Sequence, residues 1–386
     1  MKSTKQKTIL LSSMFLIVTG QLLLAHTKGI LVDKESRQPI PYVSIYTTNG
    51  NKTFGTMSDE KGEFSIDFPF QTLFFVHMNY EKSEIKKSDL SDTIHLMPTT
   101  VMLDEVVVSN SEPAWIKRVL NRIAEQKSQH YQTIEKTLAY KYETYTLTDS
   151  NGYAFKSNGN LLVPKLSNSS KYYLDAQNNT IKYKDKTAGV AFSNLKRMLY
   201  NDFINSFDKK FIKENNFSQN SSFESENTNV VQLVFTSKKF KDDEGYVLID
   251  TLNNIIIEAE RNLGTDSNIK TQTSSILRDV VSNQGFHYNT WITSSHIKYD
   301  KIGQSYYISE CKYKFYMKTT TKNKKGDSQY FSSIESKLYL DSEIKNTSKE
   351  YKVIPKPYYI IAIYTKKMQR EEDALNKVPV SFEKFK

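Results

Sequence analysis

Histidine is the residue type in this chain best suited to acid–base or metal chemistry. The chain has six: His26, His77, His95, His130, His287 and His296. None stands in a His-x-x-Glu or His-Glu-x-x-His pattern, which are spacings typical of catalytic zinc sites. His287 and His296 lie nine positions apart in one expected strand, so we expect them on opposite faces, unable to share an ion. The sequence therefore predicts no metal site.

A nucleophile is equally hard to find. Cys311 is the only cysteine, so an exported chain would have no internal disulfide. In the expected strand over residues 305–317, Cys311 shares one face with Tyr313 and Phe315, which predicts a buried apolar position rather than a reactive thiol. No Gly-x-Ser-x-Gly elbow, Walker loop or Gly-x-Gly-x-x-Gly motif is present. We expect no catalytic residue, no cofactor-binding residue and no enzyme.

The acidic run Lys241-Asp242-Asp243-Glu244-Gly245 offers carboxylate oxygens that could meet a calcium ion. A calcium loop needs oxygen ligands at alternating positions and a distal glutamate, which this run lacks. We therefore expect a charged hairpin tip.

The first 25 residues read as an export leader. Lys2, Lys5 and Lys7 precede an apolar run, and Ala25 is a small residue suited to cleavage. This pattern is typical of a secretory signal peptide, and an uncleaved membrane anchor is the alternative. No later stretch approaches 18 apolar residues. We expect an exported protein, in the periplasm or associated with the outer membrane, whose membrane contact is peripheral at most once the leader is removed.

Composition favours a folded, β-rich chain. Of the 386 residues, 38% are hydrophobic, and 25 Tyr and 21 Phe suit half-buried strand surfaces. The formal net charge is +10, but three of these charges lie in the leader and the other lysines are scattered. A scattered basic surface is solvated, so we expect no nucleic-acid partner.

Residues 26–109 form the first expected domain. Apolar and polar residues alternate over residues 42–47 and 63–68, and residues 58–62 predict a hairpin turn in which Gly62 can take a positive φ. Short strands at this spacing predict a β-sandwich. Residues 29–33, 38–45, 55–56 and 58–64 together resemble the carboxypeptidase-regulatory-like domain.

That resemblance implies a non-catalytic, seven-stranded, transthyretin-like Greek-key sandwich. Such domains often stand at the N-terminus of exported and outer-membrane proteins of gram-negative bacteria, including TonB-dependent receptors. Residues 103–109 resemble the segment that joins this domain to the receptor plug. The chain is too short for the plug and barrel of a complete receptor. Whether Asp104–Val108 engages an energy-transducing protein stays open, the alternative being the last strand of the sandwich.

Beyond residue 109 the pattern predicts a linker helix over residues 110–130 and a β-rich domain over residues 131–386. Apolar residues at helical spacing predict a helix near residues 193–212, and residues 215–229 read as a loop. Strands are expected over residues 230–236, 245–250, 255–260, 287–299, 305–317 and 330–340. Sequential hairpins favour a curved antiparallel sheet with two α-helices. An outer-membrane barrel is disfavoured because both faces of several strands are polar.

We therefore predict a non-enzymatic, exported envelope protein that acts as a binding or scaffold module, with the concave face of the large sheet as its candidate site. Its partner would be an envelope protein, a lipid or a glycan. The first alternative is a carrier of lipid or another apolar ligand, which requires a cavity near Phe203, Phe207 and Phe211; it rests on the outline of the lipoprotein-carrier fold alone. The second is a hydrolase whose residues converge only in three dimensions.

Overall fold

The structure is a computed structural model. It describes residues 27–41, 43–49, 52–59, 61–77, 80–98, 113–148, 151–167, 171–182, 192–221, 223, 225, 227, 229–273, 285–323, 326–344, 351–357, 370–371, 373–375 and 377–383. The expected leader, residues 1–25, and Asp104–Val108 lie outside this part of the chain. The chain divides into two compact units, formed by most of residues 27–97 and by residues 98–386.

The first unit is the expected β-sandwich. One sheet has the order β4-β1-β7, and the other has the order β3-β2-β5-β6. β1 and β7 are parallel, whereas β1 is antiparallel to β4 and β2 is antiparallel to β5. The bounds are β1 (Thr27–Asp33), β2 (Ser44–Asn49), β3 (Lys52–Met57), β4 (Glu63–Ile66), β5 (Thr72–His77), β6 (Tyr80–Lys86), η1 (Lys87–Asp89) and β7 (Thr93–Leu96).

The turn before β4 shows how local sequence sets this fold. The Asp59 carboxylate accepts hydrogen bonds from the backbone N–H groups of Lys61, at 2.8 Å, and Glu63, at 2.9 Å. Gly62 has φ +75°, and a Cβ there would lie 2.6 Å from the Leu31 carbonyl oxygen. Only glycine fits this conformation so close to β1, so the predicted positive φ at Gly62 is confirmed. The turn is not the expected hairpin, because β3 and β4 on either side of it belong to different sheets.

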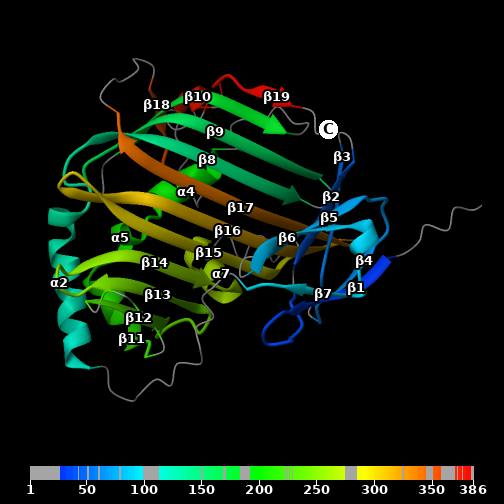
Figure 1. The fold of residues 1–386 in the computed structure, drawn as a ribbon, viewed down its shortest axis with the longest axis horizontal. Coiled ribbons are helices and arrows are strands. Elements are labelled where there is room, and N and C mark those ends of the chain that lie inside the picture. Colours follow the sequence, from blue (N-terminus) through cyan, green and yellow to red (C-terminus); the bar gives the residue numbers. More distant parts are fainter. Residues whose placement is uncertain are drawn as a thin grey trace, which may run out of the picture. The chain divides into compact units, whose positions relative to one another are not determined.

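The second unit is dominated by a 12-stranded sheet (Figure 1). Its order is β11-β12-β13-β14-β15-β16-β17-β8-β9-β10-β18, and β19 pairs in parallel with β10. The bounds are β8 (Lys136–Thr148), β9 (Asn151–Val163), β10 (Tyr172–Lys182), β11 (Asn215–Gln219), β12 (Val230–Ser237), β13 (Asp243–Asp250), β14 (Ile255–Leu263), β15 (Phe286–Ile302), β16 (Ser305–Asn323), β17 (Gly326–Glu343), β18 (Lys352–Ile354) and β19 (Ser381–Glu383). The predicted fold class, mainly β with a sandwich and a large antiparallel sheet, is confirmed.

Helices cover one face of this sheet, and Figure 1 shows α4, α5 and α7 behind it. They are α2 (Ala114–His130), α4 (Ser193–Tyr200), α5 (Phe203–Ser206), α6 (Lys209–Glu214) and α7 (Thr265–Gln272). Apolar residues of α2, α4, α5 and α6 share one core with the strands. No helix in the described part of the chain is long and apolar enough to cross a membrane.

The helical region differs from the sequence prediction in two ways. Three short helices, rather than one, occupy the expected helix at residues 193–212, because Asp202 caps α5 and Asp208 caps α6. A carboxylate that accepts from the next backbone N–H groups ends one helix and begins another. α7 was not expected, and β11 occupies the start of the expected loop at residues 215–229.

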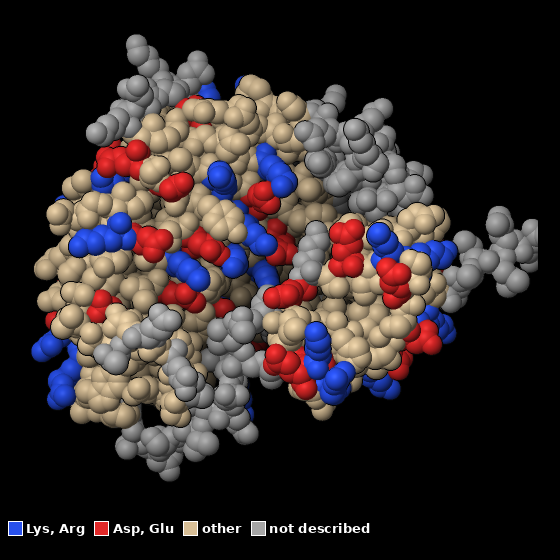
Figure 2. Space-filling model, in the orientation of Figure 1, with Lys and Arg blue, Asp and Glu red and all other residues tan. Residues whose placement is uncertain are grey.

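The sheet face turned to the viewer in Figure 2 carries acidic and basic side chains interleaved. Ion pairs on the strands of the large sheet include Lys156–Glu143, at 2.7 Å, and Lys337–Glu335, at 3.5 Å. Exposed pairs of this kind contribute about 0–1 kcal/mol each. The pairs affect the surface potential more than the stability, because they leave no broad region of one charge sign on the strands that bear them.

Candidate ligand-binding site

Cys311 is fully buried in the core, as its position on the apolar face of the expected strand predicts, and burial raises the pKa of its thiol. His26 lies outside the described residues. In the described part of the chain, no three His, Cys, Asp or Glu side chains form a group that could hold a metal ion.

The expectation that His287 and His296 face opposite sides is wrong. The β15–β16 register shifts between Tyr288 and Thr290, so the two histidines pair with Thr320 and Lys312, eight positions apart on β16. This bulge puts both on one face, which an uninterrupted count of nine could not show. They remain about 26 Å apart along the strand, at ~3.3 Å per residue.

His296 does belong to a polar cluster with two neighbouring strands. Its Nε2 lies 2.8 Å from Glu258 Oε1, and the Tyr246 hydroxyl donates to the same oxygen at 2.7 Å. Burial raises the pKa of Glu258, but the hydrogen bonds from His296 and Tyr246 outweigh it and lower that pKa to about 2. Among the described residues, His296 Nδ1 has no hydrogen-bond partner.

The acidic run at residues 241–245 lies where the connection between the antiparallel strands β12 and β13 enters β13, so its predicted place at a hairpin is confirmed. The Asp242 carboxylate accepts from the backbone N–H of Asp266, at 2.7 Å, and from the Ser267 hydroxyl, at 2.9 Å, both in α7. Asp243 is 3% exposed and forms two 2.8 Å hydrogen bonds with Arg261. The expected charged tip is therefore wrong for these two residues, because each carboxylate is used to hold a neighbouring element.

The three phenylalanines proposed for a carrier cavity pack against one another. The ring centroids of Phe203 and Phe211 are 5.4 Å apart, and those of Phe207 and Phe211 are 5.7 Å apart. Phe235 of β12 lies 5.3 Å from Phe211 and closes the cluster from the sheet. Such spacing is that of a filled aromatic core. None of the three lines either cavity described below.

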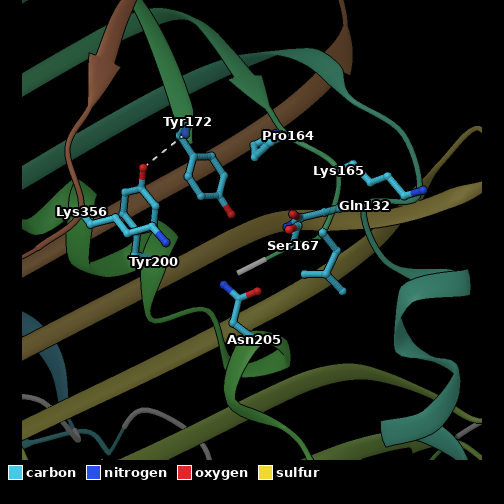
Figure 3. A pocket seen from close by; sticks show the side chains of 9 residues that line it. Gln132, Pro164, Lys165, Ser167, Tyr172, Tyr200, Asn205 and Lys356 are labelled. Carbon is cyan, nitrogen blue, oxygen red and sulfur yellow. Dashed lines mark hydrogen bonds between the residues drawn. The ribbon is translucent and has the colours of Figure 1, made fainter. Parts of the chain in front are cut away.

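A small cavity lies where β9 ends and β10 begins (Figure 3). Its volume is about 150 Å³. The lining comes from segments far apart in the sequence: the turn after α2, the β9–β10 connection, α4, α5 and the residues after β18. These residues are Gln132, Pro164, Lys165, Leu166, Ser167, Tyr172, Tyr200, Asn205 and Lys356.

Gln132 is fixed at the floor of this pocket by its backbone. Its N–H donates to the Tyr306 carbonyl and its own carbonyl accepts from Leu166, each at 2.9 Å. Gln132 has φ +45°, an unusual conformation for a residue with a side chain, and is 3% exposed. A strained, buried and polar residue of this kind costs about 1–3 kcal/mol, so the surrounding bonds must hold it in place.

Two tyrosines form a second wall. The Tyr200 hydroxyl donates to the Ile354 carbonyl at 2.7 Å and accepts from the Tyr172 backbone N–H at 3.3 Å. The two rings are nearly perpendicular, with centroids 5.1 Å apart. Tyr200 thereby joins α4, β10 and β18, while Lys356 Nζ lies 5.7 Å from the centre of its ring. Burial raises the pKa of Tyr172, so its hydroxyl stays protonated at neutral pH.

α5 carries Asn205 to the pocket, and Lys127 of α2 holds α5. The ammonium group of Lys127 donates to the carbonyl oxygens of Ile204, at 2.8 Å, Phe207, at 2.9 Å, and Asn205, at 3.3 Å. These carbonyls lie at the C-terminal end of α5, where a cation is favourable. Burial lowers the pKa of Lys127, opposed by the charges of Asp208 and Asp202.

Asp202, which begins α5, is a fully buried carboxylate beside this pocket. Its Oδ1 accepts hydrogen bonds from the Tyr299 hydroxyl and, at 3.4 Å, from the Ile204 N–H. Its Oδ2 has no hydrogen-bond partner among the described residues. Burial raises the pKa of Asp202 to about 6, although these hydrogen bonds and the Lys127 charge oppose the shift. The Asp202 charge in turn contributes to the raised pKa of Tyr172.

The pocket lining consists mainly of hydrogen-bonding groups. The described residues that form it supply two amines, two amides and three hydroxyls, all of which can form hydrogen bonds with a bound molecule. Sequence reasoning missed the site because its residues come from loops and helix ends, where no periodic pattern links them.

A second, more open cavity of about 520 Å³ lies beside β10 and β18. Its charged lining residues are of both signs: Asp175, Lys352, Arg370, Asp373 and Lys377. This mixed lining selects no class of ligand.

Comparison with known proteins identifies the first unit only. The model of the CarboxypepD_reg-like domain matches residues 27–108, which supports the resemblance found in the sequence. The match does not reach a receptor plug, and engagement of Asp104–Val108 by an energy-transducing protein stays a prediction. No curated protein matches the chain.

Among solved structures, lipovitellin is 9% identical over 56% of this chain, with a TM-score of 0.26. The chain spans only 26% of the length of lipovitellin. A Vibrio parahaemolyticus domain described as an outer membrane lipoprotein-sorting protein is 8% identical, over 67% of this chain and 98% of its own, with a TM-score of 0.25. The Pseudomonas aeruginosa MucA/MucB complex matches at 9% identity, over 59% and 94%, with a TM-score of 0.21. Likeness at this level gives no information about function.

Proposed function

We propose that the protein is an exported, non-enzymatic binding protein of the bacterial envelope, and that the pocket lined by Gln132, Tyr172 and Asn205 holds a small polar ligand. The observation that supports this proposal is the convergence of neutral hydrogen-bonding side chains from separate elements on one cavity of about 150 Å³. Pockets with a few well-placed polar groups are the usual form of a ligand site.

The way the pocket is built favours a binding role. Backbone bonds fix Gln132, the Tyr200 hydroxyl joins three elements, and Lys127 holds the helix that carries Asn205. Side chains held in this way lose little conformational freedom when a ligand binds, which improves affinity. The first unit, which resembles a non-catalytic module, would then serve as the scaffold or adaptor that attaches the binding unit to an envelope partner.

Thermal unfolding with defined probes tests the proposal. The mature chain is heated with methanesulfonate, acetate, glycerol or glucose, each at up to 50 mM and constant ionic strength. We expect at least one probe to raise Tm, because a ligand that binds only the folded state stabilises it by about 1.4 kcal/mol at ten times Kd. We expect Asn205→Leu, which replaces an amide of the lining by an apolar group, to abolish that increase.

Tyr330→Phe is the matched control. Tyr330 lies on β17, is 50% exposed and does not line the pocket, so this substitution removes one hydroxyl without changing the pocket. Tyr172→Phe removes the corresponding hydroxyl inside it. The proposal requires Tyr172→Phe to weaken the response and Tyr330→Phe to preserve it. A panel in which no probe changes Tm, or a response that Asn205→Leu leaves intact, would contradict it.

A further inference from the structure

We infer that a short, extended peptide binds in the cavity of about 520 Å³ beside β10 and β18, the β10 cavity, and adds a strand to the large sheet. This site goes beyond the proposed function and is separate from the pocket that holds Gln132. The mixed charges of its lining select no ligand by themselves. Three features of the molecule support a peptide: an interrupted sheet edge, the segment that walls it, and charged side chains without an ion pair.

The edge of the sheet at β10 is only partly paired. β9 pairs with β10 along residues 173–182 on one side. On the other side, β18 pairs with residues 172–174 and β19 pairs with residues 180–182, toward opposite ends of β10 (Figure 1). Between them, residues 175–179 have no strand partner on that side in the described part of the chain. At ~3.3 Å per residue, this stretch leaves about 17 Å of open edge, the length of a short extended peptide.

The open stretch faces the cavity with groups that a strand can bond. Asp175 and Ala176, at its start, line the β10 cavity. An open strand edge presents backbone N–H and C=O groups to any further strand. β18 is antiparallel and β19 is parallel to β10, so this edge already accepts added strands in both directions. The bulge at Gln177 breaks the register, which restricts a new strand to a few residues. Main-chain hydrogen bonds of this kind supply the affinity when a peptide is bound by strand addition.

A second wall of the cavity is the segment that leads to β19, and both of its ends are fixed to β10. Glu371 forms a 2.7 Å ion pair with Lys171, just before β10. The Pro379 carbonyl accepts a 3.0 Å hydrogen bond from the Asn179 side-chain amide. Leu375, between these contacts, is fully buried in the core. The wall is therefore formed before a ligand arrives, so binding requires little ordering of the protein.

Charged side chains of both signs surround the cavity without neutralising one another. The lining residues that have no ion-pair partner among the described residues are Lys352, Arg370, Asp373 and Lys377. Asp175 is occupied differently, since its Oδ2 accepts from the Asn160 amide, at 3.1 Å, and the Gln177 amide, at 3.0 Å. Acidic and basic side chains of a bound peptide can each meet an opposite charge here. Because exposed ion pairs add little affinity, we expect these groups to select the peptide sequence rather than to hold the peptide.

Four pentapeptides test the inference. Each is acetylated and amidated, with valine at positions one, three and five and with glutamate or lysine at positions two and four, in all four combinations. Calorimetric titration of the full mature chain is expected to show saturable binding of at least one of them. No binding by any of the four peptides would overturn the inference.

N-methylation of the peptide that binds tests whether its main chain is used. A strand added to one edge donates from alternate residues only. Methylating positions one and three, or positions two and four, keeps the side chains and the charge. We expect one of these two forms to bind at least tenfold more weakly and the other to bind within threefold of the parent. Two forms that both bind like the parent, or that are weakened equally, would overturn the inference.

Two substitutions in the lining locate the site. Ala374→Trp, which fills the β10 cavity, is expected to weaken binding at least tenfold, whereas Ala114→Trp, at an exposed alanine of α2, is expected to leave it unchanged. Lys377→Glu changes an exposed residue and does not depend on filling the cavity. It is expected to shift the preference among the four peptides at least threefold towards lysine, and Lys141→Glu on β8 is not. Equal effects of site and control variants would overturn the assignment to this cavity.

Hydrogen exchange locates the added strand on the backbone. Saturating peptide is expected to slow exchange at least tenfold at one or more amides of residues 175–179, and to leave β11, at the other end of the sheet, unchanged. Protection confined to other residues would overturn the inference. Titration with 6-aminohexanoate, a zwitterion without a peptide bond, tests the alternative occupant: binding as tight as that of the peptide would indicate a site for small zwitterions and overturn the assignment. Asn205→Leu is expected to leave peptide binding unchanged, so the inference and the proposed function fail independently.

Discussion

The buried carboxylate of Asp202 should reduce the stability of the second unit as pH rises. Its pKa is raised from the ordinary 3.8 to about 6 by burial, so the folded state holds a proton more tightly than the unfolded state does. The contribution of Asp202 to stability is therefore fully present below its unfolded pKa and is lost as pH rises through its folded pKa. The shift of about two units corresponds to a total loss of about 3 kcal/mol.

Asp202→Asn removes this ionisation while keeping an oxygen that can accept from Tyr299 and Ile204. About a third of the total loss has already occurred at pH 4.5, because the unfolded chain is mostly ionised there. The unfolding free energy of the variant minus that of the natural chain should thus rise by about 2 kcal/mol between pH 4.5 and pH 7.5. Taking the difference cancels the titration of all other groups.

Urea unfolding followed by tryptophan fluorescence measures this difference. Both tryptophans, Trp115 on α2 and Trp291 on β15, belong to the second unit, so the signal reports the unit that contains Asp202. Asp208→Asn is the matched control, because Asp208 caps α6 with a 2.8 Å hydrogen bond from an exposed position. A difference for Asp202→Asn that stays constant with pH, or that Asp208→Asn reproduces, would refute the assignment of a raised pKa to a buried carboxylate.

Three further predictions concern single positions. Lys127→Met should lower the unfolding free energy by about 2–3 kcal/mol in urea, because three carbonyl oxygens of α5 lose a charged donor; an effect below 0.5 kcal/mol would show that water replaces it. Gly62→Ala should lower the unfolding free energy of the first unit by about 1–3 kcal/mol, which calorimetry would detect as a lower Tm. An unchanged Tm would mean that the turn relaxes. Cys311 should react with a thiol reagent only in denaturant, and rapid labelling of the native chain would contradict its burial.

Sequence reasoning succeeded where a pattern is repeated over a whole element. Apolar and polar residues alternate along the long strands β15, β16 and β17, because one face of each strand is more buried than the other. That alternation can be read directly in the sequence. The short elements were harder. The apolar stripe from Leu195 to Phe211 continues through Asp202 and Asp208, so its period predicts one helix, whereas local capping by these carboxylates produces three.

The candidate site could not be predicted in the same way. Gln132, Tyr172 and Asn205 come from three separate segments, and only the pairing of β9 with β10 and the docking of α2 on α5 bring them together. Likewise, the bulge in β15 that turns His287 and His296 to one face has no marker in the sequence. Tertiary contacts decided these features, and the sequence alone carries no local signal for them.

The central claim is that this pocket holds a ligand, and nuclear magnetic resonance of the side-chain amides tests it most directly. Gln132 and Asn205 each place an NH₂ group at the pocket, whereas Asn158 and Asn178 lie on neighbouring strands outside its lining. Titration with the probe that raises Tm should shift the Gln132 and Asn205 signals in a saturable manner and leave those of Asn158 and Asn178 unchanged. Signals that do not respond, or that all drift together without saturation, would contradict the account.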